Sequence, residues 1–182
     1  MTLPLLAYRL ITRAIEPLTP RLLDARVKQG KEDPVRVDER LGVAGVARPD
    51  SDLIWLHGVS VGETTSLLPL VSALRSRRPD LGVLVTSGTV TSAELLAARL
   101  PDGVIHQFAP VDAPGAVRGF LDHWRPDLAI FAESEIWPNL VLGANERGAR
   151  MALVSARMTE ESARGWARLP ASARALLAAF DL

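Results

Sequence analysis

Short apolar runs alternate with helix-forming stretches along most of this chain, and that alternation constrains the fold more than any other feature. The apolar runs are Leu53–His57, Gly82–Thr86, Val104–Phe108, Leu128–Ala132 and Met151–Val154. The stretches with helical spacing are Thr65–Arg77, Ser92–Leu100, Pro114–Trp124 and Glu135–Arg147. Strands that alternate with helices form βαβ units, which build a parallel sheet covered on both faces. The sequence therefore predicts an α/β fold with a Rossmann-like parallel sheet flanked by helices.

The first thirty residues differ from this pattern. Leu3, Leu6, Leu10, Ala14 and Leu18 recur at helical spacing, but charged residues and prolines interrupt the segment before it could span a membrane. The segment up to residue 31 contains more basic than acidic residues. The six basic residues are Arg9, Arg13, Arg21, Arg26, Lys28 and Lys31, and the two acids are Glu16 and Asp24. Such a helix either packs on its own domain or lies in the headgroup layer of an anionic membrane. We expect an amphipathic, membrane-proximal segment at residues 1–30 and the α/β domain at residues 31–182, with residues 30–52 as a polar connection.

Composition limits the chemistry. The 21 basic and 21 acidic side chains cancel, which does not favour nucleic-acid binding. The absence of cysteine excludes disulfides and cysteine nucleophiles. The three histidines, His57, His106 and His123, have no metal-ligand spacing, so we predict no metal site.

Ligands of open parallel sheets bind beyond the carboxyl ends of the strands, so each strand-to-helix loop is a candidate site. The first loop runs from His57 to Glu63. Gly62 and Ser60 could face a ligand there, with the positive end of the next helix behind them. An ionised Glu63 at the helix start suits removal of a proton from a hydroxyl. Equally, Glu63 could be an ordinary first-turn acid that stabilises its helix.

The same loop contains Gly58-Val59-Ser60-Val61-Gly62, the pattern of a serine-hydrolase nucleophile elbow. A triad would also need an acid followed by a histidine, and Asp112 with His123 offers that order. Against this alternative, the preceding strand is the first of the sheet, whereas the elbow normally follows several strands. His123 also falls within a predicted helix.

The next loops carry further candidates. Ser87 and Thr89 follow the second strand and could bind a phosphate or a sugar hydroxyl. The neighbouring Thr91 or Ser92, together with Glu94, resembles a helix-capping arrangement. After the fourth strand, Glu133 closes an apolar run, and a carboxylate there is costly unless something binds it. Glu135 is either a ligand of the substrate or a helix-start acid.

Two long segments, residues 55–63 (WLHGVSVGE) and 133–140 (ESEIWPNL), resemble the Kdo transferases of lipopolysaccharide synthesis, where Kdo is 3-deoxy-D-manno-octulosonic acid. Weaker matches lie at residues 123–128, 155–157 and 161–165, and the resemblance covers nearly the whole chain. Two positions depart from the family: Ser134 stands where threonine is common, and Ser155 where asparagine is common.

The resemblance implies the amino-terminal, acceptor-binding half of a GT-B glycosyltransferase. A second domain, absent from this chain, would bind the donor CMP-Kdo, so the isolated half would be inactive. The acceptor would be a lipid A precursor at the cytoplasmic side of the inner membrane. Glu63 maps onto the family's general base and Glu133 onto its second important acid, for an inverting transfer without a metal or cofactor. A third hypothesis is a non-catalytic binding module with the same sheet.

Overall fold

The centre of the computed structural model, which describes residues 1–133 and 136–182, is a five-stranded parallel sheet. Its strands have the spatial order β3-β2-β1-β4-β5. Their bounds are β1 Leu53–His57, β2 Gly82–Ser87, β3 Val104–Phe108, β4 Leu128–Ala132 and β5 Arg150–Val154. Every neighbouring pair is parallel, so the predicted α/β fold is confirmed. Only β2 and β5 differ from the prediction, each being one residue longer.

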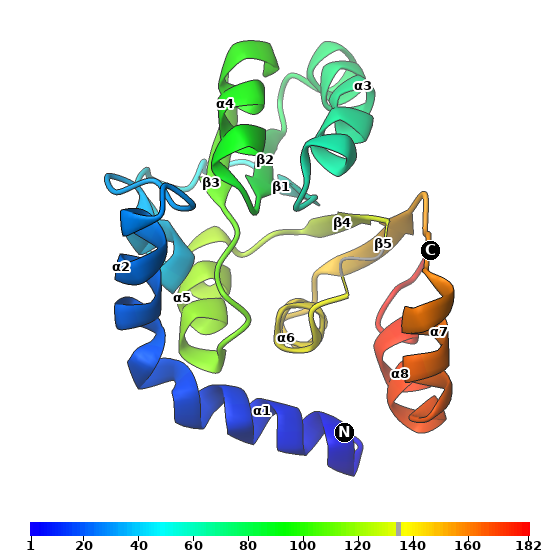
Figure 1. Ribbon diagram of the computed structural model, residues 1–182. Coiled ribbons are helices and arrows are strands. Elements are labelled where there is room, and N and C mark those ends of the chain that lie inside the picture. The colour runs from blue at the N-terminus through cyan, green and yellow to red at the C-terminus, as the bar shows by residue number, and fades with distance from the viewer. Residues whose placement is uncertain (134–135) are drawn as a thin grey trace.

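Helices lie on both faces of this sheet (Figure 1). On one face are α3 (Val61–Arg77) and α4 (Val90–Arg99), and on the other are α5 (Pro114–Trp124) and α6 (Pro138–Glu146). Successive residues of β1 point to opposite faces. Trp55 packs on Phe120 of α5, with ring centroids 5.0 Å apart, whereas Leu56 lies in the cluster of α3 and α4. Burial on both faces explains why the strands are continuous apolar runs.

Three of these helices begin elsewhere than predicted. α3 begins at residue 61 and not 65, α4 at 90 and not 92, and α6 at 138 and not 135. The first two begin earlier because the side chains of Ser60 and Thr89 cap them. The third begins at a proline, which is suited to the first turn of a helix.

The amino-terminal helix α1 (Leu3–Ile15) forms an outer layer across α5 and α6 (Figure 1). Its inner side packs: Leu5 is buried in the core, and Tyr8 donates a 2.8 Å hydrogen bond to Asp112. Its outer side leaves Leu3, Ile11 and Ile15 exposed. The expectation of a helix packed on its own domain is confirmed for the inner side, and membrane contact by the outer side stays a prediction. Among the described residues, no helix combines the length and apolarity needed to cross a membrane.

The remaining elements complete the chain. They are the 3₁₀ helices η1 (Glu16–Leu18) and η2 (Val37–Leu41), and the α-helices α2 (Thr19–Lys28), α7 (Glu160–Ala167) and α8 (Pro170–Leu177). Pro170 begins α8, at the first helical position, where proline is favoured.

Residues 30–52 are more than a polar connection, because two of their acids are buried and one of them bonds to the edge strand β3. Glu39 is 8% exposed and accepts hydrogen bonds from Arg36 at 2.8 Å and from the backbone N–H of Phe108 at 2.7 Å. Glu32 is 3% exposed and pairs with Arg26 at 2.8 Å. Buried carboxylates require such partners. The segment therefore connects α2 to β1 and, in addition, bonds to an outer strand.

The other outer strand, β5, is also bonded along its edge. The backbone N–H of Asp181 donates to the carbonyl of Met151 at 2.8 Å, and the N–H of Leu153 donates to the carbonyl of Leu182 at 2.8 Å. The Asp181 carboxylate accepts from the N–H of Met151 at 2.9 Å. Residues 181–182 thus continue the pairing of the sheet beyond β5.

Gly42 provides a test of this packing, because its φ of 84° is left-handed and a Cβ there would overlap the carbonyl oxygen of Ala116. Gly148 has the same conformation, with φ 83°, but a Cβ there would meet nothing within 4 Å. We expect Gly148→Ala to cost about 1 kcal/mol of unfolding free energy from the backbone alone, and Gly42→Ala roughly 1–3 kcal/mol more from the overlap. Chemical denaturation of both variants measures the difference. Equal losses would contradict the packing of η2 on α5.

Candidate functional site

The topological switch point of the sheet lies between β1 and β4. These two strands pair directly, with His57 opposite Phe131, but the helices that follow them cover opposite faces. At such a point the two following loops diverge and leave a crevice, which is where open α/β sheets bind ligands. The loops that begin at Gly58 and at Glu133 leave the sheet at this switch point, and the place between their starts is called the crevice. The two segments that carry the family resemblance therefore meet at one edge of the sheet.

The loop after β1 is held by the side chains of Ser60 and Glu63. Ser60 caps α3, its Oγ accepting from the N–H of Glu63 at 3.3 Å. The Glu63 carboxylate accepts from the N–H of Val59 at 2.6 Å and from the Ser60 hydroxyl at 2.7 Å. Glu63 is 8% exposed. The expected position at the helix start is confirmed, but the carboxylate does not stand free at the rim: it holds the loop as a first-turn acid does.

The loops after β1 and β2 form one hydrogen-bonded unit. Gly58 donates to the carbonyl of Thr86 at 3.2 Å, and Gly88 donates to the carbonyl of Val59 at 3.1 Å. A Cβ on Gly88 would lie 2.5 Å from the Val59 side chain, so only glycine allows this approach. Gly62 is different, because it is exposed and a Cβ there would meet only Ser60 Oγ, at 3.9 Å. The first turn of α3 is therefore open to solvent at Gly62.

The two hydroxyl candidates of the second loop have structural partners. Ser87 is buried, and its Oγ lies 2.9 Å from His106 Nε2. Thr89 is exposed and caps α4, accepting from the N–H of Ser92 at 3.1 Å, while the Ser92 side chain accepts from the N–H of Thr89 at 3.2 Å. The capping box is thus Thr89 with Ser92, and the expected pairing of Thr91 or Ser92 with Glu94 is wrong. Ligand roles of Ser87 and Thr89 stay predictions.

Glu133 occupies an unusual backbone conformation directly after β4. Its φ is 58°, a left-handed value that is uncommon for residues other than glycine, and its N–H donates to the carbonyl of Val154 at 2.9 Å. Ser155, after the neighbouring β5, has φ 52°. Two strained residues side by side at the ends of two strands are typical of functional sites. Glu135 and Ser134 lie outside the described residues.

A partly buried polar cluster at the start of α6 could not be found by spacing in the sequence. Asp112 accepts from the Tyr8 hydroxyl at 2.8 Å and from the N–H groups of Asn139 and Leu140 at 3.1 and 2.8 Å. Burial raises the pKa of Asp112, and burial next to that carboxyl raises the pKa of Tyr8. Asp112 thus ties α1 to the start of α6. The one signal in the sequence is an acid two residues before the start of a predicted helix.

His57, the last residue of β1, lies inside the sheet and not at the crevice. Its Nδ1 is 2.8 Å from the Thr86 hydroxyl, which also accepts from Trp55 Nε1 at 2.8 Å. Burial lowers the pKa of His57 to about 3. The ring is therefore a neutral core group that joins β1 to β2.

The structure separates the three members of the hydrolase triad. Ser60 stands at the carboxyl edge of the sheet, whereas His123 lies in the last turn of α5, at the opposite edge, 2.9 Å from the carbonyl of Val46. Asp112 is bonded to Tyr8 and to the start of α6. Because a triad needs direct contact between its members, the serine-hydrolase alternative is wrong for these residues. Within the two described ranges, no three His, Asp or Glu side chains gather as a metal site would require.

The fold and the site together define a Rossmann-like α/β domain with acidic residues at its switch point. A sequence-family model described as "3-Deoxy-D-manno-octulosonic-acid transferase (kdotransferase)" matches residues 35–182. The chain belongs to the Kdo transferase family.

Individual relatives agree with this assignment. The chain is 38% identical over 159 residues to a "Probable 3-deoxy-D-manno-octulosonic acid transferase, mitochondrial" of Arabidopsis thaliana, an alignment that covers 87% of this chain and 36% of the relative. It is 36% identical to the 3-deoxy-D-manno-octulosonic acid transferase of Rickettsia bellii, covering 87% and 38%. It is 37% identical to that of Bordetella pertussis, covering 96% and 42%. The chain therefore spans less than half the length of these relatives.

The buried histidines make the stability of the domain depend on pH. The pKa of His57 falls from 6.5 to about 3 on burial, and that of His106 to about 4. Between these values and pH 6.5 the unfolded chain binds protons that the native state does not, so stability falls as the pH is lowered through this window. The raised pKa of Asp112 acts in the opposite direction. We expect a loss of up to about 1.4 kcal/mol per pH unit for each histidine.

The variant His57→Gln isolates one of these contributions. It should lower the unfolding free energy at neutral pH, because Trp55, His57 and Thr86 share one hydrogen-bonded group. It should also make the fall between pH 6.5 and 4 shallower, since one proton-binding difference is removed. Urea denaturation across this pH range measures both effects. A slope equal to that of the wild type would show that His57 does not titrate as described.

Proposed function

We propose that this chain is the acceptor-binding half of an inverting transferase that moves Kdo from CMP-Kdo to a lipid A precursor. A second domain, outside these 182 residues, would bind CMP-Kdo and face this one across a GT-B cleft. The observation that supports the proposal most is the position of Glu63 and Glu133, which follow paired neighbouring strands at the switch point of a Kdo transferase family domain. In open α/β sheets this is where substrates are bound.

In the proposed reaction, Glu63 takes the proton from a hydroxyl of the acceptor sugar. The oxygen then attacks the anomeric carbon of Kdo, the bond from that carbon to CMP breaks, and CMP leaves with the electron pair. Attack opposite the leaving group inverts the configuration. No protein-bound metal or cofactor takes part in this step. Glu133 would orient Glu63 or hold acceptor hydroxyls.

The hydrogen bonds of Glu63 are compatible with a role as a base. A carboxylate offers about four acceptor positions, and the two hydrogen bonds from Val59 and Ser60 leave others for an acceptor hydroxyl. The same two bonds fix the carboxylate in place, as precise proton transfer requires. The open first turn at Gly62 gives a route of approach.

The other proposed binding residues differ in how easily a ligand could reach them. Ser60, Gly62 and Thr89 are partly or fully exposed beside the crevice and remain part of the proposal. Ser87 also remains part of the proposal, but it is buried and its Oγ contacts His106 Nε2, so a ligand would have to displace that contact. Glu135, which lies outside the described residues, remains a proposal from the family resemblance.

Substitution of Glu63 separates its two roles in the complete transferase that carries this domain. Glu63→Gln keeps an acceptor oxygen for the loop but removes the base, so we expect kcat to fall by about 10²–10⁴-fold with little change in melting temperature. Glu63→Ala also removes the loop hydrogen bonds and should cost roughly 1–3 kcal/mol of stability. The matched control is Glu94→Gln, an exposed acid near the start of α4. A Glu63→Gln enzyme with wild-type kcat would favour the non-catalytic binding module instead.

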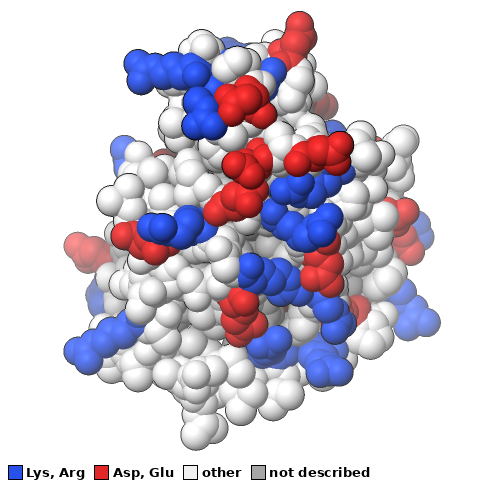
Figure 2. Space-filling model, turned by 180° about the vertical axis from the view of Figure 1, so that it is seen from behind, with Lys and Arg blue, Asp and Glu red and all other residues white. Residues whose placement is uncertain are grey.

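We also propose that the outer side of α1 and α2 contacts the anionic cytoplasmic surface of the inner membrane. Leu3, Ile11 and Ile15 on α1, with Leu18 and Leu22 after it, are all more than half exposed. Figure 2, which views the molecule from behind, shows Lys and Arg side chains spread over that face with Asp and Glu among them, and several Lys and Arg lie in its lower part, above an uncharged lower edge. Exposed apolar residues beside basic ones are characteristic of helices that lie in the membrane interface.

Matched pairs of exposed apolar residues test this contact. Ile11→Asp/Ile15→Asp should weaken binding to vesicles that contain phosphatidylglycerol by about tenfold or more, because it removes apolar area and adds negative charge to the proposed surface. Val43→Asp/Val46→Asp changes residues of similar exposure, 57% and 53% against 61% and 53%, in the segment before β1. Vesicle cosedimentation measures both variants. If the two pairs lose binding equally, α1 is not the contact surface.

A further inference from the structure

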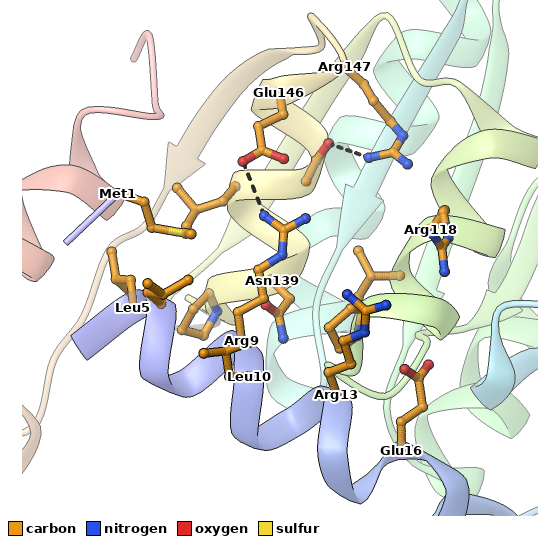
Figure 3. Close-up of a pocket in the computed structure, with 16 residues that line it drawn as sticks. Met1, Leu5, Arg9, Leu10, Arg13, Glu16, Arg118, Asn139, Glu146 and Arg147 are labelled. Atoms are coloured by element: carbon orange, nitrogen blue, oxygen red, sulfur yellow. Dashed lines mark hydrogen bonds and ion pairs between the residues drawn. The ribbon is translucent and has the colours of Figure 1, made fainter. Parts of the chain in front are cut away.

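A groove of about 390 Å³ lies between α1 and the two helices beneath it, α5 and α6 (Figure 3). Its size is in the range of sites that bind small molecules or lipid headgroups. Apolar side chains from all three helices line it, including Leu5 and Leu10 from α1, Val117 from α5 and Leu142 from α6. The groove is distinct from the crevice at Glu63 and is formed largely by the helix that we place at the membrane.

Four arginines also line the groove: Arg9, Arg13, Arg118 and Arg147. Two of them are neutralised, since Arg9 pairs with Glu146 at 3.6 Å and Arg147 pairs with Asp122 at 2.8 Å. The other two, Arg13 and Arg118, have no hydrogen-bond or ion-pair partner among the described residues. Figure 3 shows their side chains extending from α1 and α5 into the same space. In the described part of the chain, the groove thus keeps two guanidinium groups that make no direct ion pair.

The acid directly after α1 that lines the groove has a hydrogen-bond partner on α5. Glu16 lines the same groove, but its carboxylate accepts a 3.0 Å hydrogen bond from the N–H of Ala116, in the first turn of α5. A Cβ on Gly115 would overlap that carboxylate, so the close approach of Glu16 depends on glycine at this position. An acid at a helix start is stabilised by the helix dipole. Glu16 therefore fastens α1 to α5 and leaves the guanidinium groups of Arg13 and Arg118 available.

We propose that this groove binds the phosphate group of an anionic membrane lipid, with Arg13 and Arg118 as its ligands. Guanidinium groups bind phosphate through paired hydrogen bonds, and the apolar lining suits the first part of an acyl chain. The inference rests on the proposed membrane contact of α1, which would bring the groove to the level of the lipid headgroups. It adds a defined lipid-binding site to what would otherwise be a diffuse attraction between basic residues and an anionic surface.

The test compares two charge-matched double variants of the 182-residue chain. Arg13→Gln/Arg118→Gln removes the proposed ligands, and Arg21→Gln/Lys28→Gln removes the same charge from exposed positions of α2. Binding is measured to phosphatidylcholine vesicles with and without phosphatidylglycerol. A diffuse attraction is worth about fivefold in affinity per basic residue, wherever it lies on the contact surface. We expect the groove variant to lose at least about tenfold more affinity for phosphatidylglycerol vesicles than the α2 variant.

Each outcome has a defined meaning. Equal losses in the two variants, with vesicle binding by the wild type intact, would overturn the lipid site and leave the membrane contact standing. No binding of the wild type to either vesicle would overturn the membrane contact, and this inference with it, whereas the transfer chemistry is tested separately at Glu63. Both arginines are exposed, so thermal unfolding should show unchanged stability of the groove variant. Inorganic phosphate is the last probe: if it shifts the Arg118 side-chain NMR signal while phosphatidylglycerol vesicles do not bind, the site takes free phosphate and the lipid proposal fails.

Discussion

The pairing of β1 with both β2 and β4 is the constraint on which the rest of this domain depends. β1 is the first strand in sequence but the central one in space. The chain places β2 and β3 on one side of it and then β4 and β5 on the other. The helices that follow β1 and β4 then cover opposite faces, and the loops between strand and helix separate. The loops that lead to Glu63 and Glu133 leave the sheet toward opposite faces because the strand order changes direction between β1 and β4.

Glu63 shows how one side chain can serve both the fold and a site. Its carboxylate closes the first turn of α3 together with Ser60, and the same hydrogen bonds hold it at the edge of the sheet. If Glu63 has the proposed role as a base, the position is sensitive to two kinds of change: loss of the carboxylate, and loss of the hydrogen bonds that hold it in place. Glu133 is held by its backbone: it has a left-handed conformation after β4, and its N–H donates to the carbonyl of Val154 at the end of β5.

Much of the fold could be predicted from the sequence, because strands buried on both faces must be apolar throughout, and the five runs were located to within one residue. Helix starts were less predictable, since they depend on which hydroxyl caps the turn: Thr89 does so for α4, ahead of the apolar periodicity. Glu63 and Glu133 could be predicted as candidates because they follow strands. Their hydrogen bonds could not be predicted, because these depend on the three-dimensional arrangement of the loops. The contact of Tyr8 with Asp112 joins residues 104 positions apart and has no local signal. The burial of Glu32 and Glu39 could not be predicted, because they lie in a segment whose composition is that of a loop.

The bonding along the two outer strands has a consequence for how the domain behaves in a crowded solution. An unpaired strand is a template on which another chain can add, and this is a common route to aggregation. Here the Glu39 carboxylate accepts a hydrogen bond from the N–H of Phe108 on β3. On β5, backbone groups of Met151 and Leu153 form hydrogen bonds with residues 181–182. At both edges of the sheet, these backbone groups are therefore already hydrogen-bonded and are not open to a strand of another molecule. Bonded edges of this kind lower the tendency of two copies of the domain to pair strand against strand.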